Sequence, residues 1–271
     1  MKHLSEVKKE ITDLEGQLSK FAVGVPKPPR KDVRSAVETE ILSDSYIAST
    51  LLLLYQELIE MKLRSFRTAS TNDGVRKMFL KYTKKAINVY DNLLKYVKLR
   101  GWIDKPSLYP NLPANASEQL DTGEAFHLWD HLTFRYDNIE LTQIFYELAQ
   151  DGDFKLLLKK GIQDVLQKDA ARLEKELTYF GIPFPHQPRV IYDNLGTVEL
   201  SDSSMFKQVY LGMQSAAVIH AQAIKQSTTN DRIRKLFNEL LLAEIGTIDK
   251  VIKFGKLKDW LQHPPQYGAV K

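Results

Sequence analysis

The chain has 271 residues, of which 43% are hydrophobic and 27% charged, a balance typical of globular proteins with a sizeable core. Its 38 basic and 34 acidic residues are mixed along the sequence and leave a net charge of +4, so we expect no nucleic-acid-binding tail. The absence of cysteine excludes disulfides, thiolate metal sites and cysteine nucleophiles.

The first residues lack the apolar segment of a signal peptide. The most apolar run, residues 47–55, is too short to cross a bilayer. We therefore expect a cytoplasmic protein without a membrane span.

Three helices are predicted in the first part of the chain. Apolar residues at three- and four-residue spacing predict a helix over residues 4–21, and a proline-rich stretch at 26–29 ends it. A Leu-Ser-Asp-Ser cluster at 42–45 can cap free backbone N–H groups, which predicts a second helix from there to about residue 67. Thr71-Asn72-Asp73 predicts the start of a third helix that runs to about residue 99. Residues 1–113 are thus interpreted as a first unit.

Four further helices are predicted beyond it. Residues 114–122 are small and polar, which favours a linker. Helical periodicity then covers four ranges, 123–150, 153–180, 202–226 and 230–257. These helices assign residues 123–271 to a second unit.

A long internal repeat relates the two units. The stretch from Thr71 to Phe79 recurs 158 positions later, from Thr229 to Phe237, and the match continues without a gap to Tyr109 and Tyr267. At a shift of 159, the helix predicted at 4–21 corresponds to the helix at 153–180. A repeat of this length predicts two related helical bundles in tandem.

The first unit has no counterpart of the helix at 123–150. A bundle of four amphipathic helices buries all four apolar faces, whereas three such helices leave a groove. We expect this groove to hold a helix of the second unit or of a partner chain, which makes self-association or a protein partner an expectation. Alternatively, the missing helix is encoded upstream of residue 1.

Several short motifs point to one kind of protein. They are the repeated Leu-Ser-Asp-Ser starts, the Thr-Asn-Asp…Arg-Lys-x-Phe caps, the Trp-x-x-x-Pro ends, the Gly-Ile-Pro-Phe-Pro stop at 181–185 and the Glu-Ala-Phe-His-Leu-Trp segment at 124–129. Together they resemble a tandem ferritin-like family of uncharacterised proteins ascribed to the spore coat of Bacillus-type bacteria, distantly similar to the spore coat protein F group. The resemblance covers nearly the whole chain. It implies an all-α fold of two ferritin-like up-down bundles, the first with three of four helices, and a place in the forespore or spore coat.

Ferritin-like bundles raise the question of a di-iron or di-manganese site, which needs carboxylates and Glu-x-x-His motifs on facing helices. The chain has one Glu-x-x-His, Glu124 to His127, and the second such motif is missing. The candidate ligands of the second unit are Glu124, His127, His131, Asp164, Asp169, His220 and Glu244. If Phe126 and Trp129 face the core, His127 and His131 lie at its edge or outside it.

Three functions remain open from the sequence. The leading one is a non-enzymatic structural or interaction protein without a cofactor, which the family resemblance implies. The second is a metal-binding bundle with Fe or Mn and an oxidoreductase or storage role in the second unit. The third is a small-ligand carrier with an apolar channel between helices. No phosphate loop, Gly-x-Ser-x-Gly or paired zinc motif occurs, and a basic group that includes Arg76 is interpreted as a solvated helix face.

Overall fold

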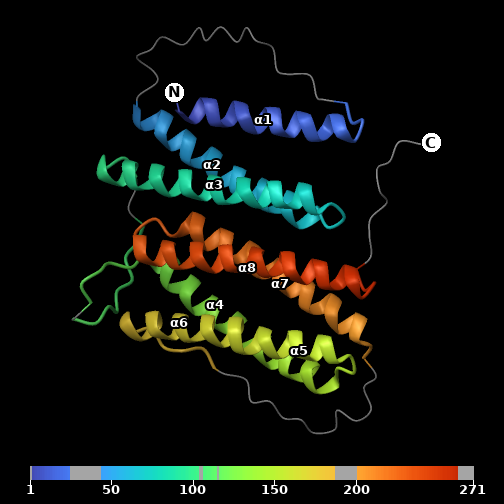
Figure 1. Ribbon diagram of the computed structural model, residues 1–271. Coiled ribbons are helices and arrows are strands. Elements are labelled where there is room, and N and C mark those ends of the chain that lie inside the picture. Colours follow the sequence, from blue (N-terminus) through green and yellow to red (C-terminus); the bar gives the residue numbers. More distant parts are fainter. Residues whose placement is uncertain (1, 25–43, 104–105, 115, 187–199, 262–271) are drawn as a thin grey trace. The chain divides into compact units, whose positions relative to one another are not determined.

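The computed structural model describes residues 2–24, 44–103, 106–114, 116–186 and 200–261 (Figure 1). Every regular element in these ranges is a helix, apart from one isolated bridge between Leu108 and Asp121, so the predicted all-α class is confirmed. The helices form two compact units. Unit 1 holds the described residues up to 103, and unit 2 holds those from 106 to 261.

Unit 1 contains α1 (Lys2–Lys20), α2 (Asp44–Thr68) and α3 (Asp73–Leu99), all close to the predicted ranges. The core of this unit lies between α2 and α3, which pack along one another. The buried apolar residues of these two helices are Ala48, Ile59, Leu63, Phe66, Tyr82, Ala86, Ile87, Tyr90, Leu94 and Val97.

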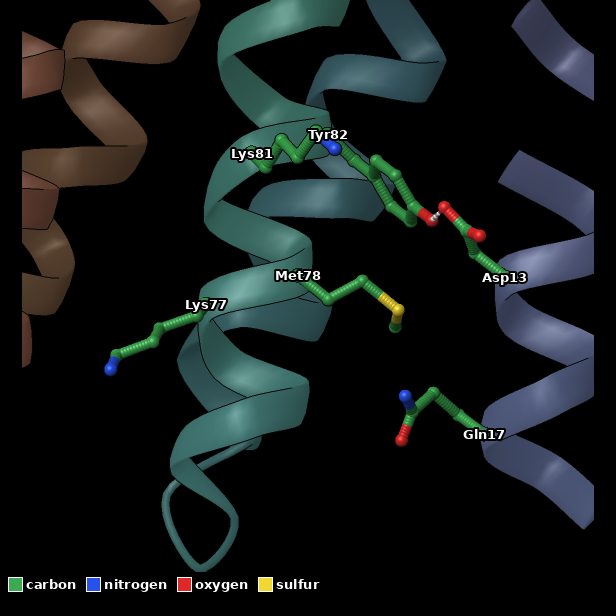
Figure 2. Close-up of a pocket in the computed structure, with 6 residues that line it drawn as sticks. All are labelled: Asp13, Gln17, Lys77, Met78, Lys81 and Tyr82. Carbon is green, nitrogen blue, oxygen red and sulfur yellow. Dashed lines mark hydrogen bonds between the residues drawn. The ribbon is translucent and has the colours of Figure 1, made fainter. Parts of the chain in front are cut away.

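The contacts that hold α1 in unit 1 are largely polar. Lys62 of α2 donates to Glu10 at 2.6 Å, and Lys85 of α3 lies 3.3 Å from the same carboxylate. Tyr82 donates to Asp13 at 2.9 Å, as Figure 2 shows. Below that bond a pocket of about 350 Å³ separates α1 from α3, and Met78 projects into the same space from α3. Unit 1 therefore contains a groove beside α1.

Unit 2 contains α4 (Thr122–Leu148), α5 (Gly152–Lys160), η2 (Gly161–Leu166), α6 (Gln167–Tyr179), α7 (Asp202–Gln226) and α8 (Asp231–Leu257). The α4 helix packs against α5, η2, α6 and α7, while α7 packs against α8. The segment from α5 to α6 was expected to be one α-helix over 153–180. It contains the π-helical turn η2 instead, because apolar spacing alone does not reveal a single wide turn inside a helix.

The segment before α4 packs onto unit 2, although residues 114–122 were expected to be a linker. Leu120 is fully buried. The Ser117 N–H donates to the Tyr179 hydroxyl at the end of α6, and the Asn230 side chain donates to Glu118 at 2.8 Å. Its small polar residues thus form hydrogen bonds to the ends of helices. Composition alone does not distinguish such a segment from a solvated linker.

The repeated caps start α3 and α8 in the same way. The side chains of Asn72 and Asn230 accept backbone N–H groups of the first turn in each helix. Arg76 and Arg234, four residues on, are fully buried and each donates to a backbone carbonyl before the helix. The expectation that Arg76 belongs to a solvated basic face was therefore wrong. Its guanidinium donates to a backbone carbonyl just after the end of α2, which has no partner within that helix.

Candidate functional site

The buried face of α4 is strongly polar. Glu124, His127, His131 and Arg135 recur at three- and four-residue spacing, and all are at most 4% exposed. Phe126 and Trp129 are 57% and 39% exposed, so the assumption that they face the core does not hold. The two histidines, which that assumption would place at the edge or outside, are buried instead.

Arg135 is the centre of a cluster that joins four helical segments of unit 2. Its Nη2 atom lies 2.9 Å from His220 Nε2 on α7, 3.2 Å from Glu244 Oε2 on α8 and 3.2 Å from Asp169 Oδ2 on α6. All four side chains are buried. Three of the predicted metal ligands thus converge on one point, and that point is a nitrogen of a guanidinium group.

The geometry of this cluster does not fit a metal ion. Metal bonds to carboxylate oxygen or imidazole nitrogen are about 2.0–2.2 Å long, whereas the three acceptor atoms surround Nη2 at hydrogen-bond distances of 2.9–3.2 Å. His220 and Glu244 are themselves 4.0 Å apart. No group of three or more metal-ligating residues suited to an ion occurs among the described residues. Arg135 supplies the positive charge that a metal would bring to these donors.

The electrostatics of the cluster reflect its burial. Desolvation raises the pKa of Glu244 and of Asp169, and the nearby Arg135 guanidinium works in the opposite direction by favouring their ionised forms. Desolvation also lowers the pKa of His220 well below its ordinary value, and Arg135 adds to this effect. The imidazole is therefore neutral, and its Nε2 accepts the hydrogen bond from Arg135.

His131 of α4 lies next to His220 in the site. Its ring lies 5.1 Å from the His220 ring and 4.6 Å from that of Phe237, centre to centre. Burial lowers its pKa to about 3, so it is neutral. Its Nδ1 donates to the backbone carbonyl of His127 at 2.7 Å. His127 in turn pairs with the Gln226 side chain at the end of α7.

Glu124 fastens the beginnings of two helices to each other. One carboxylate oxygen accepts the backbone N–H groups of Thr229 and Asn230 at 3.0 and 2.7 Å, just before α8. The other accepts the N–H of Asp121, whose side chain caps α4 in return. Burial raises the pKa of Glu124 to about 7, although these N–H donors oppose the shift. Each of these hydrogen bonds joins the carboxylate to the backbone at the start of a helix.

The remaining candidate, Asp164, lies away from the cluster. Its side chain is largely exposed and pairs with Lys168 at 3.0 Å. Of the seven predicted ligands, Asp169, His220 and Glu244 meet at Arg135, while His131 stacks beside them. The sequence interpretation missed Arg135 itself. The signal was present, because residues 127, 131 and 135 are four apart and share one face of α4.

Comparisons with known proteins place the chain among uncharacterised relatives. The sequence model of the family described as "Protein of unknown function (DUF3231)" matches residues 113–271. No curated protein matches the chain. A solved structure from Bacillus halodurans C-125, described as a "putative spore coat protein", is similar with 24% identity and a TM-score of 0.50.

That match covers 60% of this chain and 96% of the other, and at this identity it shows a likeness of fold. The family match confirms the predicted resemblance to an uncharacterised family. The ferritin-like relationship stays a prediction. None of the described helices is long and apolar enough to pass through a membrane.

Proposed function

The chain belongs to the DUF3231 family of proteins of unknown function, and from its own residues we propose that it is a non-enzymatic structural protein that self-associates through unit 1. Spore-coat association is part of this proposal. It is supported by the similar fold of the Bacillus halodurans protein, whose description names the spore coat. A coat is an assembly of proteins, so a surface for assembly is the feature such a function requires.

The observation that carries the proposal is a pair of apolar stripes on α1 and α2. On α2, positions 47, 51, 54, 58 and 61 are all apolar and recur at alternating four- and three-residue spacing. On α1, positions 4, 7, 11, 14 and 18 do the same. This spacing is that of helices that pair along an apolar seam. The large apolar side chains exposed on these stripes are Leu4, Val7, Ile11, Ile47, Leu51, Leu54 and Met61.

The repeat shows why the stripes lie on these two helices. In the repeat, α1 and α2 correspond to α6 and α7 of unit 2. Both α6 and α7 pack against α4. Unit 1 contains no described counterpart of α4, so the surfaces that would contact it stay exposed. The exposed stripes thus correspond to the place where a fourth helix packs in unit 2.

A second copy of the chain is the occupant that we propose. Two copies can place the same apolar stripes against each other across a twofold axis, the most common symmetry of protein dimers. Each copy would then cover the other's exposed leucines. Burial of such side chains contributes about 1.5–3 kcal/mol each when it is complete, which offsets an association cost of about 4–15 kcal/mol.

The Arg135 cluster supports the non-enzymatic part of the proposal. The donors that converge there are neutralised by an internal guanidinium. Glu124 is occupied by backbone N–H groups. These groups are therefore held in structural roles.

Light scattering on the full chain tests the proposal. We expect a dimer or larger species for the wild type. The double substitution Leu51→Glu and Leu54→Glu should yield a monomer, because it places charges on the α2 stripe. The matched control is Leu99→Glu, since Leu99 is a strongly exposed leucine of unit 1 outside both stripes, and it should keep the wild-type mass.

Melting curves recorded in parallel establish that each variant is folded. A wild type that is monomeric at high micromolar concentration would contradict the proposal. So would a folded double variant that keeps the wild-type mass.

A further inference from the structure

Unit 2 contains a cavity of about 470 Å³ between the α5–η2 segment and the α7–α8 pair, with α4 along its side. Its volume lies in the range of small-molecule sites, which are about 300–1,000 Å³. Most of its lining is apolar, with side chains that include Leu157, Val165, Val209, Met213 and Val251. We propose that this cavity binds a neutral, single-chain amphipathic molecule, such as a fatty alcohol, with its polar end at Arg135.

Aromatic and polar side chains both line the cavity. Phe254 is one of the lining residues. It belongs to an aromatic cluster with Phe154, Phe206 and Trp260, whose ring centres lie 5.4–6.4 Å apart. Arg135 and Glu244 line the cavity as well, and they bring the polar cluster to it. A ligand with an apolar chain and one polar end matches this distribution of side chains.

Charge favours a neutral ligand. The single positive charge of Arg135 already faces two carboxyl groups, those of Asp169 and Glu244. An anionic headgroup would place a third acidic group around one guanidinium, and an ammonium would lie beside that guanidinium. Both arrangements cost free energy in a buried site.

A free hydrogen-bond donor indicates what the polar end should be. Arg135 Nε is buried and has no hydrogen-bond partner among the described residues, although its neighbour Nη2 is fully engaged. The side chain is 2% exposed and lines the cavity. A buried donor without a partner is unfavourable. An acceptor oxygen on the ligand, such as a hydroxyl or carbonyl, would satisfy it.

The experiment uses the full chain and the neutral fluorescent probe N-phenyl-1-naphthylamine. We expect saturable binding of the probe and its displacement by 1-octanol. Octanoate and octylamine, which have the same chain length and opposite charges, should need at least about tenfold higher concentrations, since each would bring a further charge into a buried site. Displacement that is strongest with octanoate or octylamine would overturn the neutral class.

Two α7 variants test the location. Val209→Trp adds bulk to a residue that lines the cavity and should weaken octanol binding at least about tenfold. Leu211→Trp introduces the same side chain two residues away, where the leucine is 62% exposed, and should bind as the wild type does.

Melting curves verify that both variants are folded. Absence of saturable binding by the wild type would overturn the inference, as would equal binding by the two variants. The Leu51→Glu, Leu54→Glu protein should still bind octanol, because this site does not depend on self-association.

Discussion

At the scale of single residues, Arg135 decides the character of unit 2. The carboxylates and histidines that a metal site would need are present and buried on four helical segments. A guanidinium lies among them, with three acceptor atoms at 2.9–3.2 Å from one nitrogen. Because that nitrogen occupies the point of convergence, these side chains bind the protein's own cation. With a small apolar side chain at position 135, the same residues would be candidate metal ligands.

Removal of this cation should be costly and should change what the site binds. Arg135→Ala leaves Asp169 and Glu244 buried without their partner, so we expect a loss of about 3–5 kcal/mol in the free energy of unfolding by urea. The control is Arg172→Ala, which breaks the exposed pair with Glu239 and should cost at most about 1 kcal/mol. Excess Mn²⁺ or Zn²⁺ should then raise the melting temperature of Arg135→Ala and leave that of the wild type unchanged. Equal shifts in the two proteins would contradict the role of Arg135.

The buried Glu124 carboxyl gives a separate prediction, which concerns the pH dependence of folding stability. Burial raises its folded pKa from 4.5 to about 7, so the folded state holds the proton more tightly than the unfolded state does. Its contribution to stability is complete below pH 4.5 and is lost as the pH rises to about 7. We therefore expect the stability difference between wild type and Glu124→Gln to shift against the wild type over this window, by at most about 1.4 kcal/mol per pH unit.

Urea unfolding at several pH values between 4.5 and 8 measures that difference. A difference that moves in favour of the wild type as the pH rises would mean that the N–H donors of Asp121, Thr229 and Asn230 outweigh burial. A constant difference would mean that the two effects cancel.

At the scale of elements, the chain repeats its helix ends faithfully. Trp260 follows α8 and packs among Phe154, Phe206 and Phe254. Gly255 makes this cluster possible. A Cβ at that position would lie 2.4 Å from the Phe206 ring. The glycine thus permits the close approach of α8 to α7.

Two glycine-to-alanine substitutions in α8 should act in opposite directions. Gly255→Ala forces Phe206 to shift in a packed cluster, so we expect a loss of about 1–3 kcal/mol in unfolding free energy. Gly246→Ala meets no atom within 4 Å and should be neutral or stabilise by up to about 1 kcal/mol, because alanine favours a helix. Thermal unfolding measures both. A Gly255→Ala protein as stable as Gly246→Ala would show that the aromatic cluster tolerates an added methyl group.

At the scale of the whole molecule, the two units use one helix pattern to different ends. Unit 2 surrounds its polar cluster with α4, α6, α7 and α8. Unit 1 has the counterparts of three of these helices and leaves apolar stripes exposed on α1 and α2. The buried arginines reflect the same difference between the two units. Arg76 and Arg234 are kept in both units, whereas Arg135 lies on the helix for which unit 1 has no described counterpart. The predicted dimer is a property of this incomplete unit.

The sequence alone determined the helices and their repeat. Periodic apolar residues and paired caps depend on neighbours three or four positions away, so the bounds of α2, α3, α7 and α8 were predicted to within a residue or two. The π-turn η2 and the packing of residues 116–121 were missed, since neither changes the local pattern. The tertiary structure alone decided which face of α4 is buried, and therefore that Arg135 meets Asp169, His220 and Glu244. The physical reason is that a buried charge is stable only beside partners, and these partners lie on three other helices, 34 to 109 residues along the chain.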